Sequence, residues 1–200
     1  MEQQPIYYDP SLYYETQTGN KLCKKNLIRG SDNIFIYGKV IMQQKNIIRG
    51  DLGRINLGKY LILCEGVTLR PSYQVQANDQ IKYSHITIGD YVIIDSNSII
   101  QAQKIGSNVH IGKNCIIGHR ANISDNVKIL DDTIIPPDTV IPPYTVYGGK
   151  PARYVAELPE TVSYIHREQA IKYYKSFQPK RTSDTKEFQF SSIQGSTAQQ

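Results

Sequence analysis

Four histidines are the side chains of this sequence best suited to acid–base or metal chemistry: His85, His110, His119 and His166. A neutral imidazole can accept a proton as a general base, and it can also donate a ring nitrogen to a divalent metal ion. His110 and His119 are predicted at outward positions on adjacent turns of a repeat, where a surface histidine is common and usually inert. Their role in catalysis therefore depends on the elements that position them.

The three cysteines, Cys23, Cys64 and Cys115, are odd in number and lie far apart along the chain. This pattern favours reduced thiols over a disulfide framework. Cys115 occupies an inward position of the repeat, so we expect it to be a small core residue.

The element that must position these side chains is a repeat of six residues. An aliphatic residue returns every six positions from Ile88 to Ile141, with one five-residue step between Ile100 and Ile105. A smaller residue recurs four places after most of the aliphatic ones. A helix or a free strand has a much shorter period, so neither accounts for the pattern. A hexapeptide repeat is the signature of a parallel β-helix, in which each aliphatic residue points to the axis.

The corners of this solenoid are predicted at the residues that precede the smaller positions. Asparagine and aspartate tolerate the left-handed backbone that such corners often need. The predicted corner residues are Tyr91, Asn97, Asn108, Asn114, Arg120, Asn126, Asp132 and Asp138. This role explains them without any site chemistry.

The repeat also sets the domain organisation. Residues 1–33 are predicted to form a tyrosine-rich N-terminal cap, and residues 34–153 the β-helix. Polar residues interrupt the repeat at 71–84, which predicts a loop pushed out between two coils. Residues 154–178 are predicted to hold a helix that packs on the solenoid, and 179–200 a disordered tail. The predicted apolar stripe of the helix is Val162, Ile165, Tyr173 and Phe177, with Ala170 beside it.

Composition argues against two classes of partner. The net charge is +5, but the basic residues are scattered, and a nucleic-acid footprint would need them clustered. No apolar run approaches the length of a membrane span, so we expect no direct membrane insertion. On composition alone, the expected location is the cytosol or the nucleus.

The solenoid resembles two enzyme families, and the first is the gamma-class carbonic anhydrases. The chain shares with that family the Arg49-Gly50-Asp51 step and the five-residue step after Ile100. In that register the three metal-ligand positions fall at Arg70, Ser96 and Gln101. Arginine stays protonated and cannot bind a metal as histidine does, so we expect no metal site.

The second enzyme family is the hexapeptide acyltransferases, which close their last coil much as residues 141–153 do here. Those enzymes need a general base, commonly histidine, beside a coenzyme A groove between subunits. Both enzyme alternatives imply a homotrimer.

A closer resemblance is to the dynactin subunit 5 family, over roughly residues 7–178. Phrases outside the repeat carry it, and the longest matching stretch is 105–118. Other matching phrases are Tyr14-Glu15-Thr16, Gly19-Asn20-Lys21, Ile47 to Leu52, Leu69-Arg70-Pro71, His85 to Asp90, and Leu158-Pro159-Glu160. Residues 149–153 depart from the family and are nearer to the general enzyme ending.

The resemblance implies a left-handed solenoid that acts as a non-catalytic subunit, without cofactor, in the pointed-end complex of dynactin. The implied partners are dynactin subunit 6, which is a second β-helix, the actin-related protein at the filament pointed end, dynactin subunit 4, and dynein cargo adaptors. The implied role is support of dynein-driven transport along microtubules, at the cytoskeleton.

The predicted partner-contact residues are Arg70, Tyr73, Lys82 and Tyr83, on or beside the inserted segment. They are polar or aromatic and the repeat does not require them, which favours a role in binding.

Overall fold

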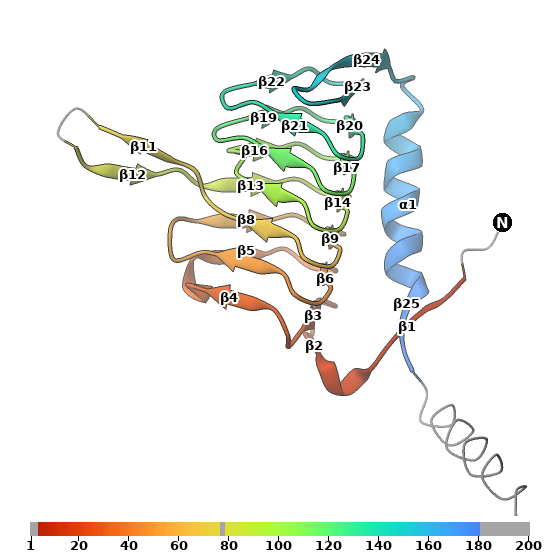
Figure 1. Ribbon diagram of the computed structural model, residues 1–200. Coiled ribbons are helices and arrows are strands. Elements are labelled where there is room, and N and C mark those ends of the chain that lie inside the picture. Colours follow the sequence, from red (N-terminus) through yellow and green to blue (C-terminus); the bar gives the residue numbers. More distant parts are fainter. Residues whose placement is uncertain (1–3, 77–78, 181–200) are drawn as a thin grey trace, which may run out of the picture.

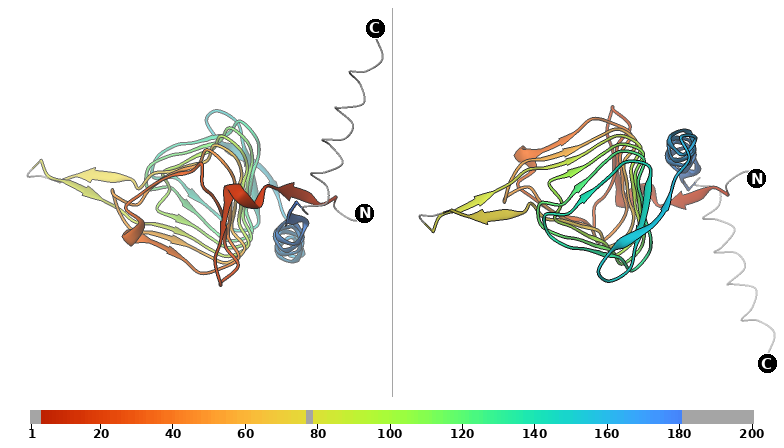
Figure 2. Two further views of the ribbon diagram at one scale, coloured as in Figure 1. Left: turned by 90° about the horizontal axis from the view of Figure 1, so that it is seen from below. Right: turned by 90° about the horizontal axis from the view of Figure 1, so that it is seen from above.

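The chain winds into a parallel β-solenoid in which each coil gives one strand to each of three sheets (Figure 1). The computed structural model describes residues 4–76 and 79–180. Seen along its axis, the solenoid has a triangular cross-section (Figure 2). The six-residue period thus predicts the architecture correctly.

The three sheets are named I, II and III here, in the order in which the chain visits them. Sheet I contains β2 (Tyr13–Glu15), β3 (Lys21–Cys23), β6 (Ile41–Met42), β9 (Ile62–Leu63), β14 (Ile93–Ile94), β17 (His110–Ile111), β20 (Lys128–Ile129), β23 (Thr145–Gly148) and β24 (Arg153–Glu157). Sheet II contains β4 (Leu27–Arg29), β7 (Ile47–Arg49), β10 (Thr68–Leu69), β15 (Ile99–Ile100), β18 (Ile116–Ile117) and β21 (Ile134–Ile135). Sheet III contains β5 (Ile34–Ile36), β8 (Ile55–Leu57), β13 (Ile86–Ile88), β16 (Lys104–Ile105), β19 (Asn122–Ile123) and β22 (Val140–Ile141).

The core is the stack of inward aliphatic residues. Ile94, Ile111 and Ile129 pair in register on successive coils, and each is at most 1% exposed. Such a coil buries its apolar side only against its neighbours, so stability is shared along the stack.

Every predicted corner residue has a left-handed backbone. The φ values run from 54° at Asn114 to 61° at Asn97, and the aromatic and basic corners Tyr91 and Arg120 both have 58°. The sequence-based prediction of the corners is confirmed.

The first coil begins at Lys21, well before the predicted start at residue 34. Strands β3 and β4 pair in parallel with β6 and β7 and so belong to the stack. The repeat is not recognisable in the sequence of this coil, because asparagines occupy inward positions that are apolar in later coils. Asn20, 4% exposed, accepts from Val40 N at 3.0 Å, and Asn26 accepts from Asn46 N at 3.0 Å. A side-chain amide can satisfy buried backbone donors in this way, so the coil closes without a small apolar residue.

The segment predicted as a loop at 71–84 is a β-hairpin. Strands β11 (Tyr73–Val75) and β12 (Ile81–Tyr83) pair antiparallel, and Ser84 N donates to Ser72 O at 2.7 Å to close its base. The hairpin projects from the corner between sheets II and III (Figure 2).

Helix α1 (Val162–Ser176) runs along the outside of sheet I (Figure 1). Ala170 packs there with Ile41, Ile62 and Ile93, which point outward from the sheet and are at most 9% exposed. The helix therefore covers one of the three faces, as expected.

The predicted stripe of this helix is wrong at one position. Ile165 is 46% exposed, whereas His166 is buried between Val162 and Ala170. The buried residues are thus four apart, and Nδ1 of His166 donates to Asn108 O at 2.7 Å.

The two ends of the described chain meet beside the helix. Strand β25 (Phe177–Pro179) pairs in parallel with β1 (Ile6–Tyr8), and the rings of Tyr8 and Phe177 stack at 4.6 Å. A short 3-10 helix, Pro10–Leu12, leads into sheet I, and a second, Ser31–Asn33, turns the first coil. Of the predicted tail, residues 181–200 lie outside the described residues.

Candidate functional site

Three of the four predicted contact residues lie together on the hairpin. Tyr73 is directly opposite Tyr83, and Lys82 is opposite Gln74. Arg70 stands just before the hairpin, exposed at the edge of sheet II. The prediction that these residues contact a partner is not tested by the structure, but the structure brings them to one region.

The hairpin is amphipathic. Alternation along its strands places Tyr73, Val75, Ile81 and Tyr83 on one side and Gln74 and Lys82 on the other. Val75 is 61% exposed and Ile81 57% exposed. A lone two-stranded hairpin is at best marginally stable in water, so this apolar side is suited to contact with another surface.

Val75 and Ile81 are candidate contact residues that sequence reasoning missed. Their signal is the period of two in Tyr73-x-Val75 and Ile81-x-Tyr83. Glutamines lie within or next to both short runs, so the composition of the segment is polar and resembles that of a loop.

An open groove of about 650 Å³ lies beneath the hairpin. On its floor, Arg120 holds Asp138 through two hydrogen bonds of 2.6 and 2.5 Å and also donates to Tyr73 O at 3.2 Å. The hydrogen bonds from Arg120 lower the pKa of the Asp138 carboxyl. Arg120 therefore ties the base of the hairpin to the solenoid through a charged pair.

The ring of His119 packs against Tyr73, with centroids 5.4 Å apart. Its Nδ1 is buried and has no hydrogen-bond partner among the described residues. A catalytic imidazole is normally oriented by a partner at its second nitrogen. Within the described chain, His119 serves as a support for the hairpin.

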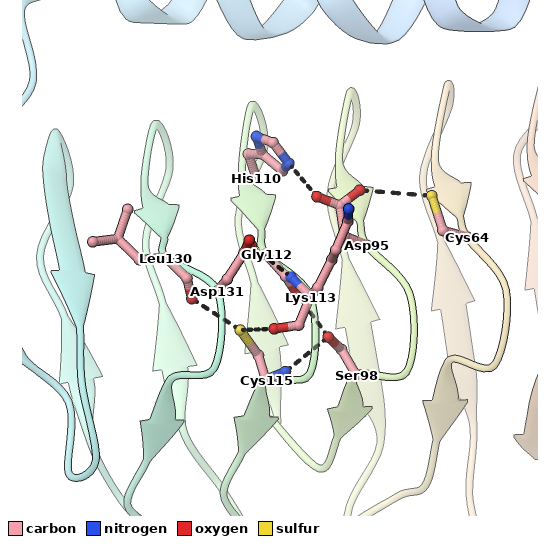
Figure 3. A network of polar contacts seen from close by, with 9 residues as sticks. All are labelled: Cys64, Asp95, Ser98, His110, Gly112, Lys113, Cys115, Leu130 and Asp131. Atoms are coloured by element: carbon pink, nitrogen blue, oxygen red, sulfur yellow. Dashed lines mark hydrogen bonds and ion pairs between the residues drawn. The ribbon is translucent and has the colours of Figure 1, made fainter.

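A second polar cluster lies between sheet I and α1 (Figure 3). His110 Nε2 and Asp95 Oδ2 are 2.9 Å apart, and the Cys64 thiol donates to Asp95 Oδ1 at 3.7 Å. Burial raises the pKa of Cys64 to about 12. Because the thiolate is the reactive form, this cysteine is a poor nucleophile at neutral pH. The carboxylate also stands between thiol and imidazole, so the histidine does not activate the thiol.

The Asp95 carboxyl has a lowered pKa. Burial, the largest single effect, raises this pKa, but the hydrogen bond and charge of His110, the hydrogen bond from Cys64 and the charge of Lys113 together outweigh it. Asp95 is thus an ionised carboxylate that accepts hydrogen bonds from the His110 ring and from the Cys64 thiol.

The same view shows why Cys115 is a core residue (Figure 3). Its backbone N donates to Ser98 Oγ at 3.0 Å, and its thiol donates to Leu130 O at 3.0 Å. Burial raises the pKa of this thiol as well. The backbone N–H and the thiol of Cys115 therefore bond to the two neighbouring coils. Cys115 is fully buried, which confirms the prediction of a small core residue.

The remaining histidines do not complete a site. His166 forms a ring contact with His110 at 6.4 Å, and burial lowers its pKa, which favours the neutral form. His85 is exposed beside the hairpin.

The three positions that correspond to carbonic anhydrase ligands do not gather in one chain. Leu69 pairs with Ile100, so Arg70 lies beside Gln101, whereas Ser96 lies at the opposite edge of sheet II. Within residues 4–76 and 79–180, no group of three or more His, Cys, Asp or Glu side chains is placed to hold a metal ion.

Solved structures similar to this chain are hexapeptide-repeat transferases. A hexapeptide transferase family protein from Anaplasma phagocytophilum has a TM-score of 0.57 at 17% identity, covering 78% of this chain and 89% of its own. AntD, an N-acyltransferase from Bacillus cereus solved with dTDP and 3-hydroxybutyryl-CoA, has a TM-score of 0.61 at 18% identity, with 75% and 86% covered. At such identities the likeness establishes the fold alone.

Sequence comparison is more specific. Dynactin subunit 5 of Dictyostelium discoideum is 49% identical over 179 residues, which is 90% of each chain. The protein-family model described as Dynactin subunit 5 matches residues 1–183. The chain therefore belongs to the dynactin subunit 5 family.

Proposed function

We propose that the chain is a non-catalytic structural subunit of the pointed-end complex of dynactin. Its family membership carries this proposal. The cytoplasm, in association with the cytoskeleton, is the corresponding location. In the part of the chain that the structure describes, no helix combines the length and apolar character needed to cross a membrane.

The geometry of the described residues supports a structural role over a catalytic one. The Cys64 thiol is held protonated by burial, and His119 packs beneath a tyrosine. Rigid stacked coils offer extended flat faces, and interfaces of this kind depend on shape complementarity rather than on a pocket.

The proposed partners are a second β-helix, dynactin subunit 6, the actin-related protein at the filament pointed end, dynactin subunit 4 and dynein cargo adaptors. The proposed contact residues on and beside the hairpin are Arg70, Tyr73, Val75, Ile81, Lys82 and Tyr83. Through these contacts the subunit supports dynein-driven transport along microtubules.

Purification of the tagged chain from the cells that produce it tests the proposal. We expect dynactin components and a second hexapeptide-repeat protein to be recovered with it, in one large complex, by mass spectrometry and size exclusion. A tagged, unrelated hexapeptide transferase is the control for adhesion to β-solenoids. Recovery of a homotrimer free of dynactin components would overturn the proposal.

A further inference from the structure

Sheet II carries an uncovered row of aliphatic side chains on its outer surface. Register places one outward residue of each coil directly beside the next along the axis. This row, called the aliphatic column here, is aliphatic at every position except Thr68 and consists of Leu27, Ile47, Thr68, Ile99, Ile116 and Ile134. Leu27 is 47% exposed, and Ile47, Ile99 and Ile116 are 37–38% exposed. With strands about 4.8 Å apart, the column extends over about 24 Å.

The other two faces differ from this one. On sheet I the outward aliphatic residues of the middle coils, such as Ile62, are covered by α1. On sheet III the corresponding positions are mostly polar, for example Asn56, Thr87 and Lys104. Sheet III has a single exposed aliphatic side chain among its outward strand positions, Val140, whereas on sheet II exposed aliphatic residues follow one another on successive coils of the described chain. Contiguous apolar surface of this kind marks interaction sites.

A row of arginines runs along one edge of the same face. Arg29 pairs in register with Arg49, and Arg70 follows on the next coil. Arg49 bonds to Asp51 at 2.8 and 2.9 Å. Within the described residues, no ion pair is found for Arg29 or Arg70. Like charges stacked on adjacent strands repel one another, so carboxylates from outside would stabilise this arginine row.

We propose that the outer face of sheet II is the docking surface for a second, different β-solenoid that lies alongside this one. Its facing sheet would present an aliphatic column of the same coil spacing, with acidic residues against the arginine row. This inference rests on the proposed function, in which a β-helix partner is expected, and it assigns the face and the chemistry of that pairing.

Shape and charge favour this occupant. A second solenoid repeats at the same strand spacing as the column, so its side chains meet every coil in register. A second copy of this chain is a less suitable partner. If two copies packed through sheet II with their axes parallel, Arg29 and Arg49 of one copy would face Lys25 and Lys45 of the other. In the antiparallel arrangement the arginine row would face the neutral residues Pro136, Gly118 and Gln101.

The face also continues into the hairpin, since Arg70 directly precedes its base at Pro71 and Ser72. A partner on sheet II would thus lie beside the hairpin.

A matched pair of double variants tests the proposal. I99K with I116K places two lysines at paired positions of β15 and β18, and N122K with V140K does the same on β19 and β22 of sheet III. Each tagged variant is purified from cells, and the second hexapeptide-repeat protein is quantified. We expect the sheet II variant to recover at least about tenfold less of it, and the sheet III variant to stay within about twofold of wild type.

The outcomes separate the inference from the proposed function. Absence of any second solenoid with the wild-type chain would count against the proposed function, and against the inference with it. Equal recovery with wild type and with I99K/I116K, or equal loss with both variants, would overturn the docking face alone.

A photocrosslinking residue at position 116 gives a readout that does not depend on the lysine variants folding. Capture of a peptide with hexapeptide repeats from a different chain supports the proposal. Capture of a helical segment, or of this chain's own peptides, would overturn it, as would the absence of any crosslink in the purified assembly.

Discussion

At the corners, the backbone conformation of single residues decides whether a coil can turn. Asn114 has a φ of 54°, a region that β-branched residues avoid at a cost of roughly 1–2 kcal/mol. We expect N114V to lower the free energy of unfolding by about that amount, whereas N114G should change it by less than about 1 kcal/mol. Urea denaturation monitored by circular dichroism measures both.

The control for the corner is I116V, which places valine on an exposed strand position two residues away. It should alter stability by less than about 0.5 kcal/mol. Equal stabilities for N114V and N114G would show that the left-handed backbone is not what the corner requires.

Protonation of His166 links the stability of the helix packing to pH. Burial between α1 and sheet I lowers its pKa below the ordinary 6.5, and the charges of His110 and Lys128 lower it further, against the bond to Asn108 O. As the pH falls below about 6.5, the unfolded chain binds a proton that the folded chain does not. The free energy of unfolding should therefore fall over this range, until the pH drops below the folded-state pKa.

The variant H166Q keeps a donor for Asn108 O and removes this titration. Urea titrations at several pH values between about 7.5 and 5.5 should show a smaller decrease in stability for H166Q than for wild type. H85Q, at an exposed position, should retain the wild-type decrease. A wild-type slope in H166Q would show that His166 does not carry the effect.

The sequence predicts a residue correctly where its position in the repeat alone determines its environment. It does not predict residues whose burial depends on a hydrogen bond to another part of the fold. Cys115 and the Asn and Asp corners follow from the period alone. Asn20 and Asn46 were missed as buried residues, because a buried amide is acceptable only when a backbone donor of the next coil bonds to it, as Val40 N and Val67 N do. Ile165 was placed inward and His166 was not, since the bond to Asn108 O depends on tertiary structure.

At the level of elements, the hairpin should be separable from the fold. Leu69 and Ile86, the inward residues that flank it, are both fully buried, so the stack can close without the intervening strands. We expect replacement of residues 73–83 by a short glycine turn to preserve the far-UV circular dichroism of the solenoid and to reduce recovery of dynactin components from cells.

A finer test compares three exposed apolar residues. V75S with I81S removes the apolar side of the hairpin, whereas V140S changes a residue of sheet III that is 66% exposed. Recovery of partners should fall for the first variant and not for the second. Undiminished recovery with the glycine turn would exclude the hairpin as a contact.

The elements differ in how far the sequence predicts them. The hexapeptide period predicts the coils because every inward residue repeats the same environment. The hairpin departs from that environment, and its two strands are too short for alternation to stand out among glutamines. The aliphatic column was visible as an isoleucine directly before the inward one, in Ile47-Ile48, Ile99-Ile100 and Ile116-Ile117. Only the strand register shows that these residues stack on one face of sheet II and form a continuous apolar surface.

At the scale of the whole molecule, two exposed apolar features are not covered by other parts of the described chain: the aliphatic column, and Val75 with Ile81 on the hairpin. Helix α1 covers only sheet I, on the side opposite the hairpin (Figure 2). Exposed apolar surface of this extent promotes self-association of an isolated subunit. A partner that binds the folded chain also stabilises it by mass action.

We therefore expect the purified chain to self-associate in a concentration-dependent way when alone, and to form a defined one-to-one species with the purified second β-solenoid. At a partner concentration about a hundred times the Kd, the melting temperature should rise by roughly 5–10 °C, because binding only to the folded state adds about 2.7 kcal/mol. The I99K/I116K variant should show less self-association and little rise in melting temperature, since both effects depend on the same face. Analytical ultracentrifugation and differential scanning fluorimetry measure the two. A stable homotrimer whose melting temperature does not change when the partner is added would mean that the uncovered faces serve symmetric self-assembly.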